Sequence, residues 1–318
     1  MTIEAKVIAH SRAHWAEFKG DYEGFFDRAQ EIVTFQLRYP RFIHSEFMTH
    51  RKFSRNASSS RAIPVSKMIE NIIADTAMPI HWGKNQPGMQ AFEEHDALVY
   101  GVCGELDMVD NRVDGVSSQA AWLQARDRAI EVAEAFHNAG YHKQIVNRIL
   151  EPFMHIDVIV TATNYDNFFW LRRHKDAQPE IKVLADKMWE ALQASTPRVL
   201  APGEWHMPYV REHEMASFDL DTLLKVSTAR CARVSYLTHD GKNPDLGKDV
   251  ALYDRLVGSA PLHASPPEHQ AKADEANWGE FGPIWANEHL SGNFDPGWVQ
   301  HRKLLDGEHC DHYVPEAA

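Results

Sequence analysis

The amino-acid sequence predicts a mixed fold of strands and helices, of the α/β or α+β class. Large apolar side chains occupy every second position from Val33 to Tyr39, which is the pattern of a half-buried strand. Residues 155–163 are rich in β-branched side chains, and apolar stripes with helical spacing lie between and after these segments. At 318 residues, the chain has room for one large domain or two modest ones with a substantial core.

The expected elements follow one another in mixed order. Pro40 opens a helix that runs into a basic segment, and residues 62–64 end it. Further helices are expected at residues 66–77, 118–139, 179–195 and 249–257. Strands are expected at 155–163 and 223–236, a connector at 197–213, and irregular structure at 82–113 and in a tail from residue 278 that wraps the core.

Two of these helices carry apolar stripes that predict their buried faces. The stripe of the helix at 118–139 consists of Trp122, Ala125, Ala129, Val132 and Phe136. The stripe of the helix at 179–195 consists of Ile181, Leu184, Met188 and Leu192.

The composition limits the functions that this chain can have. Its formal net charge of −12 argues against an extended nucleic-acid surface, although a local arginine cluster can still attract a small anion. The three cysteines, Cys103, Cys231 and Cys310, are far apart in the sequence, which indicates a reducing compartment. The sequence shows no signal-like start and no apolar run of membrane-spanning length, so we expect a cytoplasmic protein without a membrane partner.

The segment Thr49–Arg61 is the most informative part of the sequence. Its residues include four cationic side chains, four serines, one histidine and one asparagine, with Phe53 as the only large apolar side chain. Guanidinium forks and short hydroxyl donors at this spacing suit a phosphate group and a flat heterocycle. The alternative interpretation is the solvated basic face of a helix.

Three further segments carry polar side chains that suit a functional site. Arg148 stands at the end of a helix just before a strand, where it either binds a ligand or caps the helix. Residues 164–174 interleave amides and arginines with aromatic rings, which fits a bound ring system or an aromatic core with a charged rim. Residues 263–269 place two histidines around Ser-Pro-Pro-Glu, which fits a metal site, a catalytic pair or a loop with satisfied histidines. Their spacing matches no zinc motif, so we predict no metal site.

Together these segments resemble the flavin-dependent thymidylate synthase family, often called ThyX. The family signature is R-H-R, seven residues, then S-x-R, and residues 50–61 match it, with Thr49 in place of the first arginine. Residues 167–172 resemble the family motif N-F-L-x-L-R, and residues 177–181 resemble the A-Q-W-E-I that follows it. Arg148 resembles the substrate-binding arginine at the end of the preceding helix.

The order of the motifs differs from that of the family. Residues 232–236 and 263–269 resemble a strand and a turn that lie before the signature in the family, but here they lie in the last third of the chain. The resemblance therefore implies an α+β fold with a central, mostly antiparallel twisted sheet flanked by helices, in circularly permuted form. It implies one catalytic domain over residues 1–318, with the signature and nucleotide-binding part in 1–200 and the rearranged strand, turn and tail in 215–318.

The resemblance implies an enzyme that converts dUMP to dTMP. Methylenetetrahydrofolate would be the carbon donor, FAD the hydride carrier and NADPH the reductant, and the enzyme would be a homotetramer that binds no nucleic acid. The residues implied for catalysis are Arg172, His263 and Arg51. Those implied for dUMP binding are Glu46, Thr49, Ser58, Ser59, Ser60, Arg61, Arg148 and Arg172. Those implied for FAD binding are Thr49, His50, Arg51, Ala57, Asn164, Asn167 and Ser265.

The chain departs from the family pattern at several positions. Thr49 replaces an arginine that in the family reaches both flavin and nucleotide, Ala57 replaces a glutamate, and Asp176 replaces a histidine. The loop from Asn164 to Asn167 is shorter than in the family, and Arg55 is a candidate to supply the charge that is lost at Thr49.

These departures leave two alternative functions open. One is a related flavin- and folate-dependent enzyme that hydroxymethylates dUMP or acts on dCMP. The other is a non-catalytic protein that binds a nucleotide or RNA through the basic segment. A cysteine nucleophile of the conventional thymidylate synthase kind is not expected, because Cys231 lies within a predicted strand.

Overall fold

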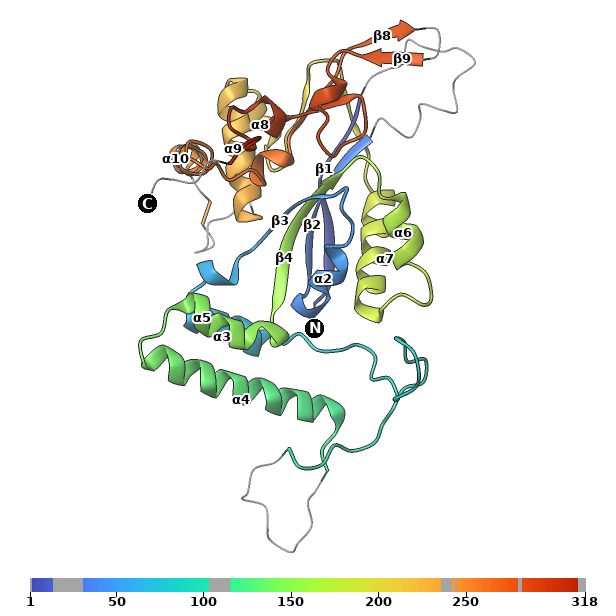
Figure 1. The fold of residues 1–318 in the computed structure, drawn as a ribbon, viewed down its shortest axis with the longest axis vertical. Helices are drawn as coiled ribbons and strands as arrows, with labels where there is room; N and C mark the ends of the chain where they lie inside the picture. The colour runs from blue at the N-terminus through green and yellow to red at the C-terminus, as the bar shows by residue number, and fades with distance from the viewer. Residues whose placement is uncertain are drawn as a thin grey trace, which may run out of the picture.

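The computed structural model describes residues 2–13, 31–102, 115–235, 242–243, 245–279 and 282–313, so Cys103 and Tyr236 lie outside the described residues. At its centre is a five-stranded sheet with the strand order β3-β4-β2-β1-β5 (Figure 1). Its strands are β1 Glu4–Ala13, β2 Glu31–Pro40, β3 Ser54–Ala57, β4 His155–Ala162 and β5 Arg198–Leu200. All paired strands of this sheet are antiparallel except β1 and β5, which are parallel. The expected α+β fold with a mostly antiparallel central sheet is therefore confirmed.

The remaining elements surround this sheet. The α-helices are α2 His44–Phe47, α3 Val65–Ala74, α4 Ser118–Asn138, α5 Lys143–Leu150, α6 Asp166–Arg172, α7 Pro179–Gln193, α8 Glu212–Met215, α9 Leu220–Arg233 and α10 Leu246–Val257. The 3-10 helices are η1 Arg41–Ile43, η2 Ser60–Ala62, η4 Glu151–Phe153, η5 Pro266–Glu268, η6 Glu288–Leu290 and η7 His301–Leu304. Short strands form two smaller sheets: β6 Trp205–His206, β7 Ala271–Ala273 and β10 Trp298–Gln300 in one, and β8 Ala276–Gly279 and β9 Gly282–Trp285 in the other.

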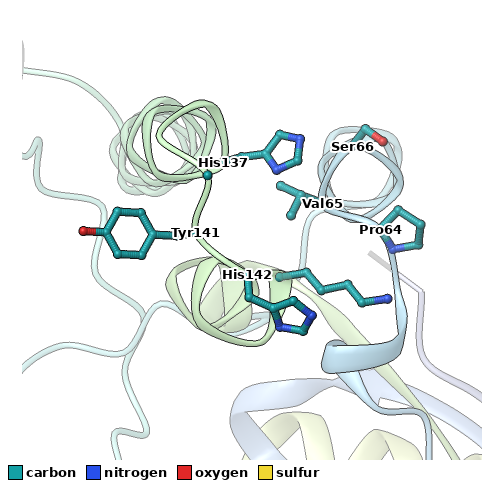
Figure 2. Close-up of a pocket in the computed structure, with 8 residues that line it drawn as sticks. Pro64, Val65, Ser66, His137, Tyr141 and His142 are labelled. Atoms are coloured by element: carbon teal, nitrogen blue, oxygen red, sulfur yellow. The ribbon is translucent and has the colours of Figure 1, made fainter.

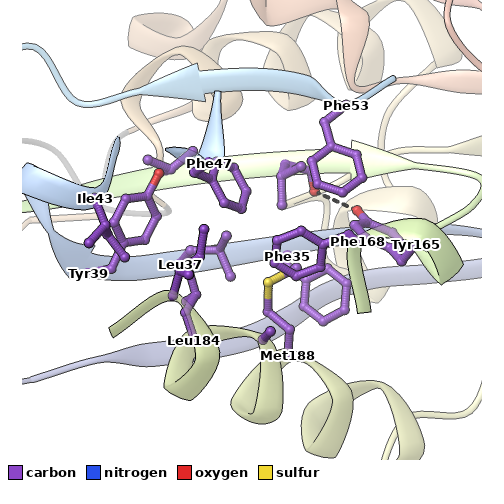
Figure 3. Close-up of a cluster of buried hydrophobic side chains, with 14 of the residues drawn as sticks. Phe35, Leu37, Tyr39, Ile43, Phe47, Phe53, Tyr165, Phe168, Leu184 and Met188 are labelled. Atoms are coloured by element: carbon purple, nitrogen blue, oxygen red, sulfur yellow. Dashed lines mark hydrogen bonds between the residues drawn. The ribbon is translucent and has the colours of Figure 1, made fainter. Parts of the chain in front are cut away.

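Helices cover both faces of the central sheet. α6 and α7 cover one face, where Phe35 of β2 lies in one buried cluster with Leu184 and Met188 of α7 (Figure 3). α9 lies against the other face, where Cys231 packs in a cluster with Ile159 of β4. The alternating pattern of β2 predicts a half-buried strand, yet most of β2 is buried because both of its faces are covered.

The helix α4 buries only part of the side that its apolar stripe predicts, since Trp122 and Ala129 pack against the core. Ile130 and Ala133 are its buried residues, and they pack in a cluster with α3 and α5. Val132 is 47% exposed and Phe136 is 37% exposed, so the second half of the predicted face is wrong. The turn after α4 returns the chain as α5, and the position of α5 decides which side of α4 is covered.

The strand expected at 223–236 is wrong, because residues 220–233 form the helix α9. The side chain of Asp219 caps this helix by accepting a hydrogen bond from the Thr222 N–H. Val226 and Arg230 are buried at helical spacing, and Val234 ends the helix with a left-handed backbone at φ 56°. Arg230 is buried and forms ion pairs with Glu214 and Asp249. The pattern of apolar residues along the sequence does not reveal a buried arginine of this kind.

The helix expected from Pro40 through the basic segment is also wrong. It is limited to η1 and α2, and residues 54–57 instead form the edge strand β3. The β4 edge provides hydrogen-bond partners for this segment, from Ser54 opposite Thr161 to Ala57 opposite Val158. The tail from residue 278 is likewise more regular than expected, since it contains β9 and β10.

In the part of the chain that the structure describes, no helix is long and apolar enough to cross a membrane.

A chain of buried hydrogen bonds crosses the sheet beneath the signature segment. His206 bonds to Ser11 at 2.9 Å and to Thr34 at 2.8 Å, Thr34 bonds to Thr161 at 2.7 Å, and Thr161 bonds to His269 at 2.8 Å. Burial lowers the pKa of both histidines to about 3, so both are neutral at neutral pH.

These two histidines make the stability of the fold depend on pH. Their pKa values are lower in the folded chain than the ordinary value of 6.5, so their contribution is full above about pH 6.5 and declines as the pH falls toward 3. Each should remove about 1 kcal/mol from the free energy of unfolding per pH unit in that window. Chemical denaturation at pH 7, 6, 5 and 4 would measure the slope, and His206→Gln should make it shallower. An unchanged slope in His206→Gln would show that His206 titrates normally.

Candidate active site

Residues of the signature segment lie on and around β3, the edge strand of the central sheet. Arg55 and Asn56 belong to β3 itself, residues 49–50 precede it, and residues 58–61 follow it. The backbone ladder between β3 and β4 fixes the directions of the Arg55 and Asn56 side chains. Three groups of polar residues result.

The first group is an arginine–histidine cluster made by Arg172, His50 and Thr49. The Nε–H of Arg172 donates to Nε2 of His50 at 3.0 Å. Its Nη2 donates to the Thr49 hydroxyl at 3.1 Å and to the backbone carbonyl of Glu46 at 3.4 Å. The fold therefore brings together three residues that the sequence analysis assigned to one site from two distant motifs.

The ring of His50 is held by the aromatic core. It lies edge-on to Phe168 with the ring centroids 4.9 Å apart, and it stacks on Phe53 at 5.7 Å. Figure 3 shows Phe53 and Phe168 beside Phe47 and Tyr165 in this core. Burial, with smaller contributions from the nearby charges of Arg172 and Arg55, lowers the pKa of His50 to about 4. His50 is therefore neutral at neutral pH, and its Nε2 accepts the hydrogen bond from Arg172.

The second group is a Glu151 cluster beyond the other end of β3. One oxygen of Glu151 accepts from Arg148 at 3.0 Å, from Arg41 at 3.1 Å and from the Ser60 hydroxyl at 3.2 Å. The amide of Asn147 donates to the backbone carbonyl of Ser60 at 2.7 Å. Two guanidinium groups share one carboxylate here, so the cluster keeps a net positive charge.

The side chains of Ser58, Ser59 and Arg61, which lie near this cluster, differ in whether they are free to bind a ligand. The Ser58 hydroxyl accepts the Asp157 N–H at 3.2 Å and so extends the pairing of β3 with β4. Ser59 and Arg61 are exposed, and their side chains make no hydrogen bond or ion pair within the described residues. Ser59 and Arg61 are therefore the available donors next to a positively charged cluster.

The third group joins β3 to the last third of the chain. The side-chain amide of Asn56 donates to the carbonyl oxygens of Cys231 at 2.9 Å and Ala232 at 3.2 Å. The Ser265 hydroxyl donates to Oδ1 of Asn56 at 3.0 Å. Two motifs that stand far from the signature in the sequence thus lie beside it in the fold, while the circular permutation itself stays a prediction.

The other expected site residues lie outside these groups. Asn164 accepts the Asp166 N–H at 2.8 Å and so forms the turn that begins α6, and Ala57 is half-buried at the end of β3. Arg51, Asn167 and His263 are exposed, and in the described part of the chain no contact links their side chains to the arginine–histidine cluster.

Several residues of the site could not be foreseen from the motifs. Glu151 stands three positions after Arg148, a spacing that can signal a helical ion pair. Arg41 gives no such signal, because its pairing with Glu151 depends on how η1 and η4 meet. The tail adds Asn293, which donates to the Lys52 carbonyl at 2.8 Å.

A cavity of about 430 Å³ lies next to the segment that follows Arg61 (Figure 2). It is formed where α3 and α5 begin and α4 ends, and its lining includes Ser66, His137, Tyr141, His142 and Lys143. None of the predicted site residues lines it, although the lining residue Lys143 donates to the Ala62 carbonyl beside Arg61.

The possible metal ligands and the buried cysteine of the described residues are as follows. Within the described residues, no three His, Cys, Asp or Glu side chains gather closely enough to hold a metal ion. Cys231 is fully buried, and burial raises the pKa of its thiol far above the ordinary value. A thiol kept protonated in this way is a poor nucleophile.

Comparisons with known proteins come from sequence and from structure. No curated protein sequence matches this chain. One similar solved structure is the crystal structure of the UMP/dUMP methylase PolB from Streptomyces cacaoi, bound with 5-Br UMP. Its sequence is 20% identical to this chain, and the match has a TM-score of 0.40 and covers 60% of this chain and 88% of that chain. Another is the crystal structure of thymidylate synthase X (ThyX) from Helicobacter pylori with FAD and dUMP. Its sequence is 14% identical to this chain, and the match has a TM-score of 0.37 and covers 60% of this chain and 93% of that chain.

The sequence model of one protein family covers more than half of the chain. It is described as Thymidylate synthase complementing protein, or Thy1, and it matches residues 29–198. This range contains the arginine–histidine cluster, the Glu151 cluster and all of β3. The chain therefore belongs to the Thy1 family of thymidylate synthase complementing proteins.

Proposed function

We propose that this protein is a flavin-dependent thymidylate synthase that converts dUMP to dTMP. Methylenetetrahydrofolate is the proposed carbon donor, FAD the hydride carrier and NADPH the reductant. The observation that carries the proposal is the arginine–histidine cluster, in which two motifs of the family meet through Arg172 and His50. Membership of the Thy1 family supports it.

Arg172 is the proposed catalytic cation. Methylation at C5 requires the uracil ring to become electron-rich, and negative charge then develops at N3 and O4. A guanidinium whose position is already fixed stabilises such charge without reorganising. Arg172 is fixed in this way by its hydrogen bonds to His50, Thr49 and the Glu46 carbonyl. The neutral His50 orients the guanidinium and adds no competing charge.

The Glu151 cluster is the proposed phosphate site for dUMP. Its net positive charge comes from Arg41 and Arg148, and the exposed donors Ser59 and Arg61 lie next to it in the chain. Paired guanidinium groups with short hydroxyl donors match the charge and the geometry of a phosphate group. The buried hydroxyl of Ser60 already donates to Glu151, so its proposed role is to support the cluster.

The residues proposed to hold FAD fit an anionic ligand with a polar ring system. Arg51 and Asn167 present side chains that no other described residue engages, and Ser265 lies beside Asn56 of β3. FAD, when bound, supplies the hydride chemistry that the side chains themselves lack. Exposed His263 is the residue proposed to reach the flavin and the folate.

The proposed assembly is a homotetramer. Val132, Phe136 and Ile145 leave apolar surface exposed on α4 and α5, at 47%, 37% and 47% of their areas. Large apolar side chains that stay exposed on a protein can mark an interface with another chain.

The identity of the product tests the proposed reaction. The purified protein should bind FAD, and with dUMP, methylenetetrahydrofolate and NADPH it should yield a product with the mass of dTMP. Liquid chromatography with mass spectrometry would identify that product. A product heavier by one oxygen atom would instead support the related hydroxymethylating enzyme, which Thr49 in place of the family arginine leaves open. Absence of flavin binding would exclude both enzyme functions.

Removing Arg172 tests the role of the cation. Arg172→Ala should lower turnover of dUMP about 100-fold or more, the loss that follows removal of one preorganised donor. Burial is the main cause of the low pKa of His50 and Arg172 lowers it further, so NMR titration should also show that pKa rising above about 4 in the variant. Arg173→Ala is the matched control, since Arg173 is the next residue and pairs with Asp186 instead. Arg172→Ala with full turnover would refute the assignment.

Light scattering tests the assembly. A homotetramer should have a molar mass four times that of the chain, 36.3 kDa, at micromolar concentration. Replacing both Val132 and Phe136 by Glu should lower that mass, because charge would enter an apolar interface. A wild-type protein with the mass of a single chain would contradict the proposed assembly.

A further inference from the structure

Arg55 is a cation of the site that has no close carboxylate partner among the described residues. It stands on β3, is partly buried, and its Nη1 donates to the backbone carbonyl of Met48 at 2.8 Å. Within the described residues, the guanidinium of Arg55 makes this one hydrogen bond, and no carboxylate lies within ion-pair distance of it. A guanidinium carries five N–H donors, so most of its hydrogen-bonding capacity is unused.

The groups around Arg55 do not neutralise its charge. Tyr39, His44 and His50 are close enough for the charge of Arg55 to act on their pKa values. Burial raises the pKa of Tyr39 and lowers those of His44 and His50, so all three are uncharged at neutral pH. The positive charge is therefore surrounded mainly by neutral groups.

The carboxylate of Glu268 does not fill this role. It acts on Arg55 through space, but it makes a short ion pair with Arg302. Arg302 also pairs with Glu308, which pairs with Lys303 as well, so two cations match the two carboxylates of this region. Burying a guanidinium that lacks a partner is costly, and burial accordingly lowers the pKa of Arg55.

The position of Arg55 connects two of the polar groups described above. Through Met48 it contacts the turn that carries Thr49 and His50, and its neighbour Asn56 holds Ser265. Arg55 therefore stands on the strand that links the turn of the arginine–histidine cluster to Ser265. The two ligands assigned to these residues in the proposed function, dUMP and FAD, both carry phosphate groups.

We propose that Arg55 is a ligand-binding residue that pairs with a phosphate group of the bound substrate or cofactor. This inference rests on the proposed function, because that function supplies the phosphate. The unused donors of a partly buried guanidinium then complete their hydrogen bonds on phosphate oxygens, and the anion provides the missing counter-charge. Arg55→Lys should retain part of the binding, since an ammonium carries the charge but lacks the planar fork.

Paired ligands with and without phosphate test the inference. Calorimetry would compare the binding of dUMP with that of deoxyuridine, and flavin fluorescence would compare FAD with riboflavin. Arg55→Gln should weaken the binding of one phosphorylated ligand about tenfold or more, the effect of losing one charge-assisted pair. The affinity for its phosphate-free counterpart should stay unchanged. The ligand that loses affinity identifies whether the phosphate belongs to the nucleotide or to the flavin.

Arg128→Gln is the matched control, because it removes the same charge from an exposed site on α4, where Arg128 pairs with Glu131. It should bind every ligand as the wild type does. Equal affinity of Arg55→Gln and wild type for dUMP and FAD would overturn the inference, and so would an equal loss with and without phosphate.

Inorganic pyrophosphate separates this inference from the proposed function. A wild-type protein that binds neither dUMP nor FAD refutes the proposed function. Pyrophosphate binding, followed by calorimetry, then decides the role of Arg55. Binding that weakens in Arg55→Gln but not in Arg128→Gln supports the inference, and binding that is absent or equal in both variants overturns it.

Discussion

The pairing of β3 with β4 is the constraint on which the rest of the site depends. Four residue pairs, from Ser54 opposite Thr161 to Ala57 opposite Val158, place a basic segment on the edge of a buried sheet. The strand then presents Arg55 toward the turn at Met48 and Asn56 toward Ser265. The residues after it reach the Glu151 cluster through Ser60. Without this ladder, the same residues would form a solvated cationic loop with no common orientation.

Burial controls the electrostatics of this site as much as the charges do. The chain carries a net charge of −12, yet its signature segment gathers cations that have few carboxylate partners. The aromatic core keeps His50 neutral, so Arg172 can donate to it while retaining its own charge. The same effect on Tyr39 and His44 leaves Arg55 without a neutralising neighbour. A local excess of positive charge can thus persist in an acidic protein, and it favours anionic ligands.

Much of the fold and the site could be predicted from local patterns. The strands at 33–39 and 155–163 and the helix at 179–195 were predicted correctly, because apolar periodicity and β-branched residues are local signals of secondary structure. The helix α9 was missed because its buried polar residue, Arg230, depends on carboxylates from two other helices. The buried side of α4 was partly wrong, since α5 decides which side is covered. Arg41 was missed because its partner Glu151 is brought close only by the fold.

The sequence by itself determined the class of chemistry, because residue types such as the guanidinium, imidazole and amide groups of residues 49–61 and 164–174 restrict the ligands that can be bound. It also determined the family, since Thy1 membership rests on the pattern within residues 29–198. Only the tertiary structure decided which cations are paired and which are available. Arg148 shares Glu151 with Arg41, Arg172 is held by His50 and Thr49, and Arg55 has no close counter-charge in the part of the chain that the structure describes. These differences depend on distances and burial between segments far apart in the chain, which local patterns do not encode.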